Sequence, residues 1–428
     1  MRPGSLDNET ARHQSRPMAA PFSAPPGETH ELVVVGGGLV GLSLGIATAQ
    51  AGLHTLVVDR EDPAATLAET FDGRASAIAY GSQQILAGLG IWAKLASDAA
   101  PILEIRVADD SAPLFLHYDH REVGDHPLGW IVENIVLRRA LLERVSELPH
   151  LAHAAPKSVA GVERGAAGAL VRLADHHAIR ARLVAAADGK TSPLRKAAGI
   201  RTIEWSYPQT GIVATVQHER PHRGVAVEHF LPAGPFAILP LTGNRSSIVW
   251  TERAELAPRI LAMSAADFAD ELRRRFGDFL GTVEPMGPRW SYPLAFLHAE
   301  NYAAERLALV GEAAHVIHPI AGQGLNLGLR DVAALAEVLV DARRLGLDIG
   351  EPNVLRRYER WRRLDNWMLA AVTDTLNRLF SNAIPPVKLA RDLGLATVNQ
   401  LPPLKRLFMR HAMGVVGDQP RLVRGEPL

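Results

Sequence analysis

The chain has 428 residues, which is long for a single hydrophobic core and favours two domains. Lys plus Arg and Asp plus Glu number 46 each, and the formal net charge of zero argues against a nucleic-acid partner. There is no cysteine, which excludes disulfides, thiolate metal sites, iron–sulfur clusters and a cysteine nucleophile, so that any redox chemistry needs a bound cofactor.

The first 29 residues are rich in Pro, Ser and Ala and lack the apolar core of a secretory signal, so we predict a disordered leader. The most apolar stretch, 31–58, is long enough to raise the question of a membrane span. Three consecutive glycines follow a strand-like run inside it, and a second such run ends it. We therefore predict a strand, a turn, a helix and a second strand of a sheet.

The turn in this unit carries a dinucleotide fingerprint, Gly36-x-Gly38-x-x-Gly41, between a strand and a helix. Such glycines permit a tight turn, let backbone N–H groups approach a pyrophosphate and let the helix pack closely on the strand. Asp59 ends the next strand, where an acid can bind an adenosine ribose, and Arg60 beside it joins the predicted cofactor-binding set. A ligand-free turn is the alternative, and the fingerprint alone does not separate NAD from FAD.

Two later strands end in a similar way. The first ends at Asp188, before a helix predicted to start near 192–193, and offers either a second cofactor contact or only a turn. The second is predicted at 306–310 and leads through Gly311 and Glu312 into a glycine-rich loop and an amphipathic helix. Backbone N–H groups and a helix N-terminus at one place suit the pyrimidine edge of a flavin, which favours FAD.

Together these motifs resemble the flavin signatures of the class A aromatic hydroxylases, the relatives of para-hydroxybenzoate hydroxylase. Four runs are similar to the ubiquinone-biosynthesis branch of that family: DGRASAIAYGSQQILAGLGIW at 72–92, GWIVENIVLRRAL at 129–141, HPIAGQGLNLGLRD at 318–331 and TDTLNRLFSN at 373–382. The resemblance covers nearly everything from 31 to about 415, and the run at 318–331 is its most specific part.

The resemblance implies roles for the residues in these motifs. Gly36, Gly38 and Gly41 would hold the FAD pyrophosphate, and Asp59 the adenosine ribose. The flavin, ribityl and phosphate contacts would come from Arg74, Asn134, Arg138, Asp188, Gly311, Glu312, Gly322, Gly324, Leu325 and Asn326. Many relatives have Gly-Asp where this chain has Gly311-Glu312, so the ribityl contact would use a longer acid.

His315 and His318 are the candidate catalytic residues, with a role toward the substrate or its proton. The alternative is that they only hold the loop. Their spacing also suggests a metal, but a proline follows His318 and no third ligand cluster is evident, so we predict no metal site.

Alternating runs between 200 and 300 predict an antiparallel sheet with an inserted helix at 264–280. Five aromatic residues there are candidates for a substrate pocket, with the core as the alternative: Trp205, Tyr207, Phe236, Trp250 and Phe296. After about 350 we predict helices, and the last 28 residues hold five Lys or Arg against two acids. This end is a candidate for peripheral membrane contact, the alternative being a helix packed on the cofactor domain.

The predicted fold is α/β, with a Rossmann-like FAD-binding domain of the glutathione-reductase type, an antiparallel-sheet substrate domain and a C-terminal helical region. The predicted division is a leader at 1–29, FAD-binding parts at 30–105, 129–200 and 301–349, substrate-domain parts at 106–128 and 201–300, and C-terminal helices and tail at 350–428.

The resemblance implies an FAD-dependent monooxygenase that hydroxylates the ring of a lipid-tailed polyprenylphenol in ubiquinone biosynthesis. Reduced FAD would add O2 at C4a, and the hydroperoxide would transfer oxygen to the ring. The electron donor would be NAD(P)H or a reduced ferredoxin-type protein, and we expect a cytoplasmic protein that contacts the inner face of the membrane and a ubiquinone-biosynthesis complex. The alternatives are a hydroxylase of a soluble phenol and a non-catalytic flavin-fold subunit of such a complex.

Overall fold

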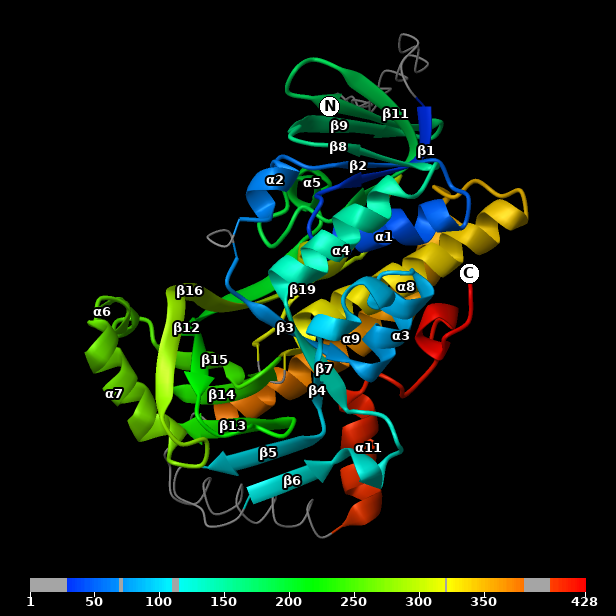
Figure 1. The fold of residues 1–428 in the computed structure, drawn as a ribbon. Coiled ribbons are helices and arrows are strands. Elements are labelled where there is room, and N and C mark those ends of the chain that lie inside the picture. The colour runs from blue at the N-terminus through cyan, green and yellow to red at the C-terminus, as the bar shows by residue number, and fades with distance from the viewer. Residues whose placement is uncertain (1–28, 69–71, 110–114, 320–321, 381–400) are drawn as a thin grey trace, which may run out of the picture.

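The computed structural model of the chain describes residues 29–68, 72–109, 115–319, 322–380 and 401–428, so residues 1–28 of the predicted leader lie outside the described residues. Two eight-stranded sheets occupy different halves of the molecule, one above the other in Figure 1. None of the helices described is both long enough and apolar enough to cross a bilayer.

The upper sheet contains the strand predicted before the glycine fingerprint. Its main order is β17 (Ala303–Ala304), β18 (Leu307–Leu309), β11 (Ala178–Ala186), β1 (Thr29–Val35), β2 (Thr55–Val58) and β8 (Leu151–Ala154), and β10 (Gly168–Leu173) and β9 (Val159–Gly165) extend from β11. Pairing is parallel from β18 through β8. The carboxyl ends of these five strands therefore lie along one edge, where open α/β sheets bind ligands.

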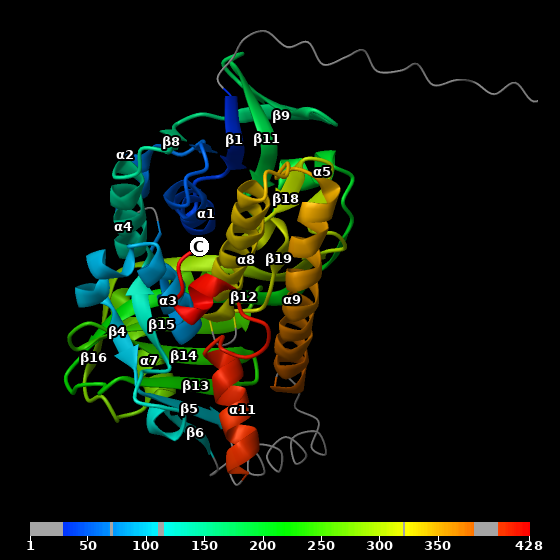
Figure 2. The same cartoon turned by 90° about the vertical axis from the view of Figure 1, so that its right-hand side faces the viewer.

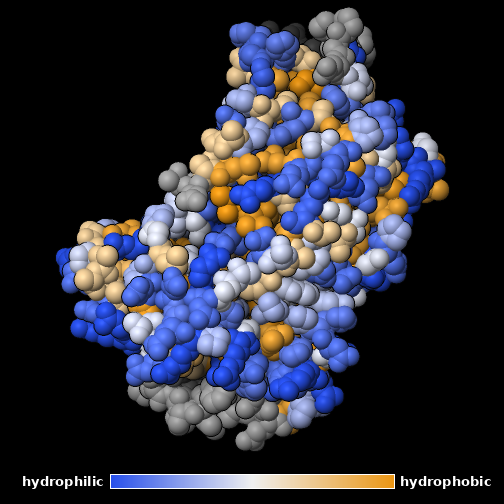
Figure 3. Space-filling view, in the orientation of Figure 1, coloured by the Kyte–Doolittle hydropathy of each residue, from blue (hydrophilic) through white to orange (hydrophobic). Residues whose placement is uncertain are grey.

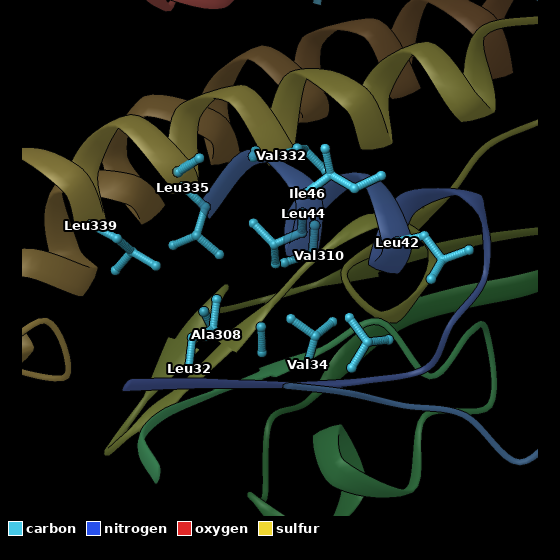
Figure 4. Packing of buried hydrophobic residues seen from close by; sticks show 14 of the residues in the cluster. Leu32, Val34, Leu42, Leu44, Ile46, Ala308, Val310, Val332, Leu335 and Leu339 are labelled. Carbon is cyan, nitrogen blue, oxygen red and sulfur yellow. The ribbon is translucent and has the colours of Figure 1, made fainter. Parts of the chain in front are cut away.

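Helix α1 (Leu39–Gln50) lies between this sheet and α8 (Gln323–Arg344), and Figure 4 shows its apolar side chains between those of β1 and α8. A helix that is apolar on all sides is stable only when it is buried, which explains why the stretch resembled a membrane span. Gly45 allows the close approach, because a Cβ at Gly45 would lie 2.6 Å from Cγ2 of Val57 in β2.

The lower sheet has the order β19 (His315–Val316), β16 (Val283–Ala299), β12 (Thr202–His218), β15 (Arg245–Arg253), β14 (Gly234–Leu241), β13 (Val225–Leu231), β5 (Glu104–Asp109) and β6 (Phe115–Asp119). Its pairing is antiparallel except between β13 and β5. Strand β5 begins two residues before the predicted boundary at 106, and β19 joins this sheet from the segment 301–349 that we assigned to the FAD-binding part.

Helix α7 (Ala265–Phe276) is the predicted inserted helix, with Ser264 as its N-cap. Three of its apolar residues recur at helical spacing and pack on the lower sheet: Phe268, Leu272 and Phe276. Trp250 stacks on Phe268 with ring centroids 6.0 Å apart, and Phe236 lies in the same buried cluster. Trp250 and Phe236 are therefore core residues, which is one of the two alternatives that the sequence left open for them.

The remaining elements cover and connect the sheets. A small sheet is formed by β3 (Ala75–Ala79), β7 (Gly129–Glu133) and β4 (Ala100–Ile102). The other elements are α2 (Pro63–Thr66), α3 (Tyr80–Gly88), η1 (Trp92–Lys94), η2 (Ala96–Asp98), η3 (His120–Glu122), α4 (Asn134–Ser146), α5 (Pro193–Ala197), α6 (Ala257–Leu261), η4 (Gly311–Ala313), α9 (Pro352–Phe380), α11 (Pro402–Ala412) and η6 (Arg421–Arg424). Helix α9 runs beside α8 (Figure 2).

The C-terminal helix α11 is held on the body of the protein by its inner face. Met409 and Met413 are buried with Ile102 and Leu128, and Lys405 pairs with Glu122 at 2.6 Å. On the face drawn in Figure 3, apolar side chains gather mainly in the upper half of the molecule, and the lower half is mostly hydrophilic. Helix α11 is thus packed, but not on the cofactor domain alone as in the second alternative, because Leu128 and Glu122 belong to the predicted substrate-domain segment 106–128.

Candidate cofactor groove and aromatic cluster

The three cofactor motifs leave neighbouring parallel strands at the same edge of the upper sheet. Gly36 follows β1, Asp59 follows β2, Asp188 lies just beyond β11 and Gly311 lies just beyond β18. Backbone hydrogen bonds continue the pairing up to the motifs, from Ala187 N to Val35 O at 2.8 Å and from Val310 N to Ala186 O at 3.0 Å. Segments far apart in the sequence therefore form one groove at the edge where α/β sheets bind nucleotides.

The fingerprint glycines have different physical reasons to be glycine. Gly36 has a φ of +105°, and a Cβ there would lie 2.3 Å from the carbonyl oxygen of Ala187. A Cβ at Gly41 would lie 1.9 Å from the Gly36 oxygen. A Cβ at Gly38 would meet no protein atom within 4 Å. Packing requires the first and third glycine, whereas the space beside Gly38, at the N-terminus of α1, fits an anionic ligand.

Asp59 and Arg60 have different surroundings although both are in the predicted set. A Cβ on Gly37 would lie only 2.5 Å from Asp59 Oδ2, so the Asp59 carboxylate borders the glycine turn. The Arg60 side chain is 78% exposed and its Nε pairs with Glu61 at 3.0 Å. The predicted cofactor role of Arg60 gains no support from this geometry.

A buried carboxylate that our sequence interpretation did not assign, Asp72, organises the residues after the first motif. It accepts hydrogen bonds from Arg74 Nε at 2.9 Å and from Asn134 Nδ2 at 2.9 Å. Burial raises the pKa of Asp72, but the hydrogen bonds and charge of Arg74 and the hydrogen bond from Asn134 outweigh burial and lower this pKa below its ordinary value. Asn134 Oδ1 also accepts from Ser76 Oγ at 2.6 Å, so both the oxygen and the nitrogen of the Asn134 side chain are hydrogen-bonded to protein groups.

Arg138 is the cation of this region that best fits a cofactor role. Its side chain is 9% exposed, and its nearest guanidinium nitrogen is 4.0 Å from Asp72. Burial lowers the pKa of Arg138, and the charges of Asp72 and Asp59 act in the opposite direction. A buried guanidinium between the glycine turn and the Asp72 cluster suits a phosphate or ribityl hydroxyl.

Asp188 provides a further indication of a ligand. Its Oδ2 accepts from Leu194 N at 3.2 Å, while its buried Oδ1 has no hydrogen-bond partner within the described part of the chain. Burial raises the pKa of Asp188 above its ordinary value, although hydrogen bonds from Ser192 and Leu194 act to lower it. A buried oxygen without a partner costs about 1–3 kcal/mol, which a bound hydroxyl or N–H group would recover.

Arg195, which the sequence interpretation missed, joins the second motif to the third. Its Nη1 donates to Ala313 O at 2.8 Å and its Nη2 to Lys190 O at 2.9 Å. Because Ala313 lies in η4, this arginine fixes the loop that carries Glu312 against the turn that carries Asp188.

The predicted flavin cradle is the start of α8. Gly322 is the N-cap with a φ of +61°, and a Cβ at Gly324 would meet nothing within 4 Å. The Asn326 side chain donates to Ala77 O at 2.8 Å and accepts from Ala79 N at 2.9 Å, which ties α8 to β3. Leu325 is half-buried. Backbone N–H groups at this helix end are therefore available to a ligand, and the Asn326 side chain is not.

Val40 brings the glycine turn and the flavin loop into contact. If Gly311 and Gly328 carried a Cβ, these atoms would lie 3.1 Å and 2.6 Å from methyl groups of Val40. The N-terminal end of α1 therefore packs on η4 and on the first turns of α8. One elongated ligand can touch both helix ends and η4.

Glu312 is exposed and has no hydrogen bond or ion pair with any described residue. Burial lowers the pKa of Arg74, but the hydrogen bond and charge of Asp72 raise it above its ordinary value, and the charge of Glu312 adds to this effect. The loop thus presents an unpaired carboxylate on the same side as Arg74.

His315 belongs to a buried network beneath the flavin loop. Its Nε2 lies 2.6 Å from Asp331 Oδ2, which also accepts from Gly311 N at 3.1 Å. Asp331 Oδ1 accepts from Arg362 Nε at 2.9 Å and from Asn366 Nδ2 at 3.1 Å. Burial raises the pKa of the fully buried Asp331, but His315 and Arg362 together hold it well below its ordinary value. This geometry favours the loop-holding alternative for His315 over a catalytic role.

His318, unlike His315, takes no part in a hydrogen-bond network of the described residues. It is fully buried, and neither ring nitrogen has a hydrogen-bond partner among the described residues. Its ring meets the Tyr207 ring edge-on, with centroids 5.1 Å apart. Burial lowers the pKa of His318 to about 4, against the charge of Asp374, so the imidazole is neutral at pH 7.

The side chains packed around His318 are aromatic and aliphatic. Trp205 and Phe296 stack with centroids 4.0 Å apart, and Ile317 and Leu327 complete the cluster with Tyr207. We call these residues, with His318, the aromatic cluster. Within the described residues no group of three or more His, Asp or Glu is arranged to hold a metal ion.

Comparison with known proteins agrees with this geometry. A family described as "FAD binding domain" matches residues 29–372. Ubiquinone hydroxylase UbiL of Rhodospirillum rubrum is 53% identical over 95% of this chain and 96% of its own. The 3-demethoxyubiquinol 3-hydroxylase of Escherichia coli is 36% identical over 90% and 98%. The solved p-nitrophenol 4-monooxygenase PnpA of Pseudomonas putida superposes with a TM-score of 0.74, at 19% identity and over 92% of this chain and 100% of its own.

The fold and the groove define an FAD-dependent aromatic-ring monooxygenase. Within that class, the chain belongs to the ubiquinone-biosynthesis hydroxylases, as the resemblance in the sequence indicated.

Proposed function

We propose that the protein hydroxylates the aromatic ring of a polyprenylphenol intermediate of ubiquinone biosynthesis. The observation that carries the proposal is the convergence of the three motifs at one sheet edge, together with the aromatic cluster, which includes Ile317 and Leu327 of the third motif. The UbiL and 3-demethoxyubiquinol hydroxylase relatives support the substrate class. The p-nitrophenol 4-monooxygenase PnpA shares the fold, but at 19% identity this likeness supports only the architecture.

In the proposed groove, the turn from Gly36 to Gly41 and the start of α1 bind the pyrophosphate, and Asp59 binds the adenosine ribose. Glu312 and Arg138 bind the ribityl chain or a phosphate, with Arg74 near the flavin. The N–H groups of Gly324 and Leu325 contact the flavin ring, and Asp188 supplies a further polar contact. Bound FAD supplies the activated oxygen, which is cofactor chemistry.

The chain's own residues would bind the ring and exclude water. The Trp205–Phe296 stack and the aliphatic side chains beside it would desolvate the ring, which would protect a reactive oxygen species from reaction with water. His318 is neutral and has two nitrogens without partners, so it can donate one hydrogen bond to the substrate and accept another. The proposed role of His318 is therefore to orient the substrate.

The test is oxygen transfer by the purified, FAD-loaded protein to a short-chain polyprenylphenol. Ring hydroxylation is expected with NADH, NADPH or a reduced ferredoxin-type protein as the donor, and running each donor separately identifies the reductant. Assembly with other ubiquinone-biosynthesis proteins stays a prediction. A protein that binds FAD but forms no hydroxylated product with any donor would contradict the proposed function.

We further propose that α11 contacts the membrane that holds such a substrate. Its inner face is packed, while Leu407 and Phe408 are 47% and 44% exposed beside the exposed Arg406 and Arg410. Apolar groups flanked by cations suit an anionic bilayer surface. The protein is expected to co-sediment with vesicles containing anionic lipid, and a Leu407→Ser, Phe408→Ser variant to bind several-fold less. Equal binding by the two proteins, or none by the wild type, would contradict this contact.

A further inference from the structure

A cavity of about 580 Å³ is lined by residues of β13, of β15 and of the C-terminal end of α7. None of the described residues that line it belongs to the cofactor groove or to the aromatic cluster. Its volume is within the range of small-molecule binding sites. The cavity is therefore a candidate site for a second ligand.

The cavity lies on the face of the lower sheet that points away from the cofactor groove. Trp250 lines the cavity and packs on α7, which Figure 1 shows at the outer edge of the molecule. On the other face, the Tyr292 ring lies 4.8 Å from the Arg74 guanidinium. Gly211 of β12 pairs with Tyr292. Its neighbour Ile212 pairs with Trp250, and successive side chains of a strand point to opposite faces, so the sheet separates the cavity from Arg74.

Arg275 of α7 is held in one orientation at this cavity. Its guanidinium lies 4.0 Å from the centroid of the Trp250 ring, and its Nη1 donates to Glu271. Its Nη2 is 4.0 Å from the nearest oxygen of Glu252, which is too long for a hydrogen bond. Among the described residues, neither Nη2 nor the buried Nε has an acceptor. The cavity thus has a preorganised guanidinium with an unused donor.

Arg253 supplies a second cation. It is exposed, and its guanidinium has no hydrogen bond or ion pair with any described residue. Two acids oppose the arginines of the cavity: buried Glu252, which accepts from Arg253 N at 2.9 Å, and Glu271, which pairs with both Arg274 and Arg275. The three arginines and two acids leave one positive charge, which suits a ligand with a single negative charge.

We propose that this cavity binds a monocarboxylate with an apolar chain. The carboxylate would accept charge-assisted hydrogen bonds from Arg253 and from Arg275 Nη2. The chain would lie against the aliphatic part of the lining, which removes it from water. That part consists of Ala108, Leu231, Pro232, Ala233 and Leu256. The site is separate from the proposed oxygen transfer and does not rest on it.

The probes are hexanoate and its uncharged analogue hexanamide, whose dissociation constants for the FAD-loaded protein are measured by ligand-observed NMR. The wild type is expected to bind hexanoate about tenfold more tightly than hexanamide. Arg253→Gln and Arg275→Gln each remove a donor and should lose most of this preference. Ala233→Trp fills the cavity and should weaken the binding of both probes by at least about fivefold.

Arg172→Gln is the matched control, because it removes the same charge from a side chain in β10 of the upper sheet that is 53% exposed. This variant should keep the wild-type preference. Hexanoate should leave the flavin absorbance unchanged, since the sheet separates the cavity from the cofactor groove. Equal binding of the two probes to the wild type, no binding of either, or an unchanged preference in Arg253→Gln and Arg275→Gln would overturn the inference. So would a change in flavin absorbance that persists in both variants, because it would place the probe beside the flavin.

Discussion

A Gly38→Val variant is expected to fold and to be purified without FAD, with its FAD affinity lowered by at least about a hundredfold. Gly38 has an ordinary φ of −69°, and no protein atom lies within 4 Å of its Cβ position, so the protein itself tolerates a side chain. The branched side chain would instead fill the space at the N-terminus of α1 that we assign to the pyrophosphate. Flavin absorbance per protein and titration with FAD measure the loss.

Gly161→Val is the matched control. Gly161 lies in β9, and its Cβ position is equally free of protein atoms within 4 Å. A valine suits an extended strand, so this variant should keep full flavin occupancy and unchanged stability. Full occupancy in Gly38→Val as well would show that the glycine turn does not bind the pyrophosphate.

The second large effect is expected at Asp331. Asp331→Asn removes the charge that pairs with the buried Arg362 and weakens the hold on His315, and breaking such a buried pair typically costs about 3–5 kcal/mol of folding stability. Because Asp331 also accepts from Gly311 N, the loop before Glu312 loosens and FAD affinity falls. Chemical denaturation with and without FAD separates the two losses.

A milder variant keeps this prediction testable if Asp331→Asn does not fold. Asn366→Ala removes one donor to Asp331 and should cost about 1–2 kcal/mol, with a weaker but measurable effect on FAD binding. Asp270→Asn is the control, since Asp270 and its partner Arg273 are 58% and 56% exposed and such pairs contribute about 0–1 kcal/mol. If Asn366→Ala lowers stability without any change in FAD affinity, the network does not position the flavin loop.

The cofactor groove was predictable from the sequence because its signals are local. The glycine spacing, the acid after the next strand and the glycines before α8 each follow from what one turn or one helix end requires, and parallel strands place them at one edge. The sequence could not show which glycine is held by packing. In the structure Ala187 O lies against Gly36, so packing explains that glycine. The space beside Gly38 is open, so a bound ligand explains that one.

The residues that were missed act through contacts between distant parts of the chain. Arg362 and Asn366 meet Asp331 across two helices, and Tyr207 meets Asp374 across 167 residues, which no periodicity predicts. For Trp250 the sequence left both the core and a pocket open, and the structure places it in the core. Helix α7 is amphipathic, and an amphipathic helix needs an apolar surface to pack on. Its sequence pattern therefore indicated that one face of the lower sheet belongs to the core.

The most direct test of the account is the origin of the new ring oxygen. The FAD-loaded protein is supplied with a short-chain polyprenylphenol, an electron donor and 18O2, and the product is analysed by mass spectrometry. The account predicts a singly hydroxylated ring that carries one 18O atom, with no product from the Gly38→Val variant. Hydroxylation with oxygen from water, or flavin oxidation that releases only hydrogen peroxide while the phenol is bound unchanged, would contradict it.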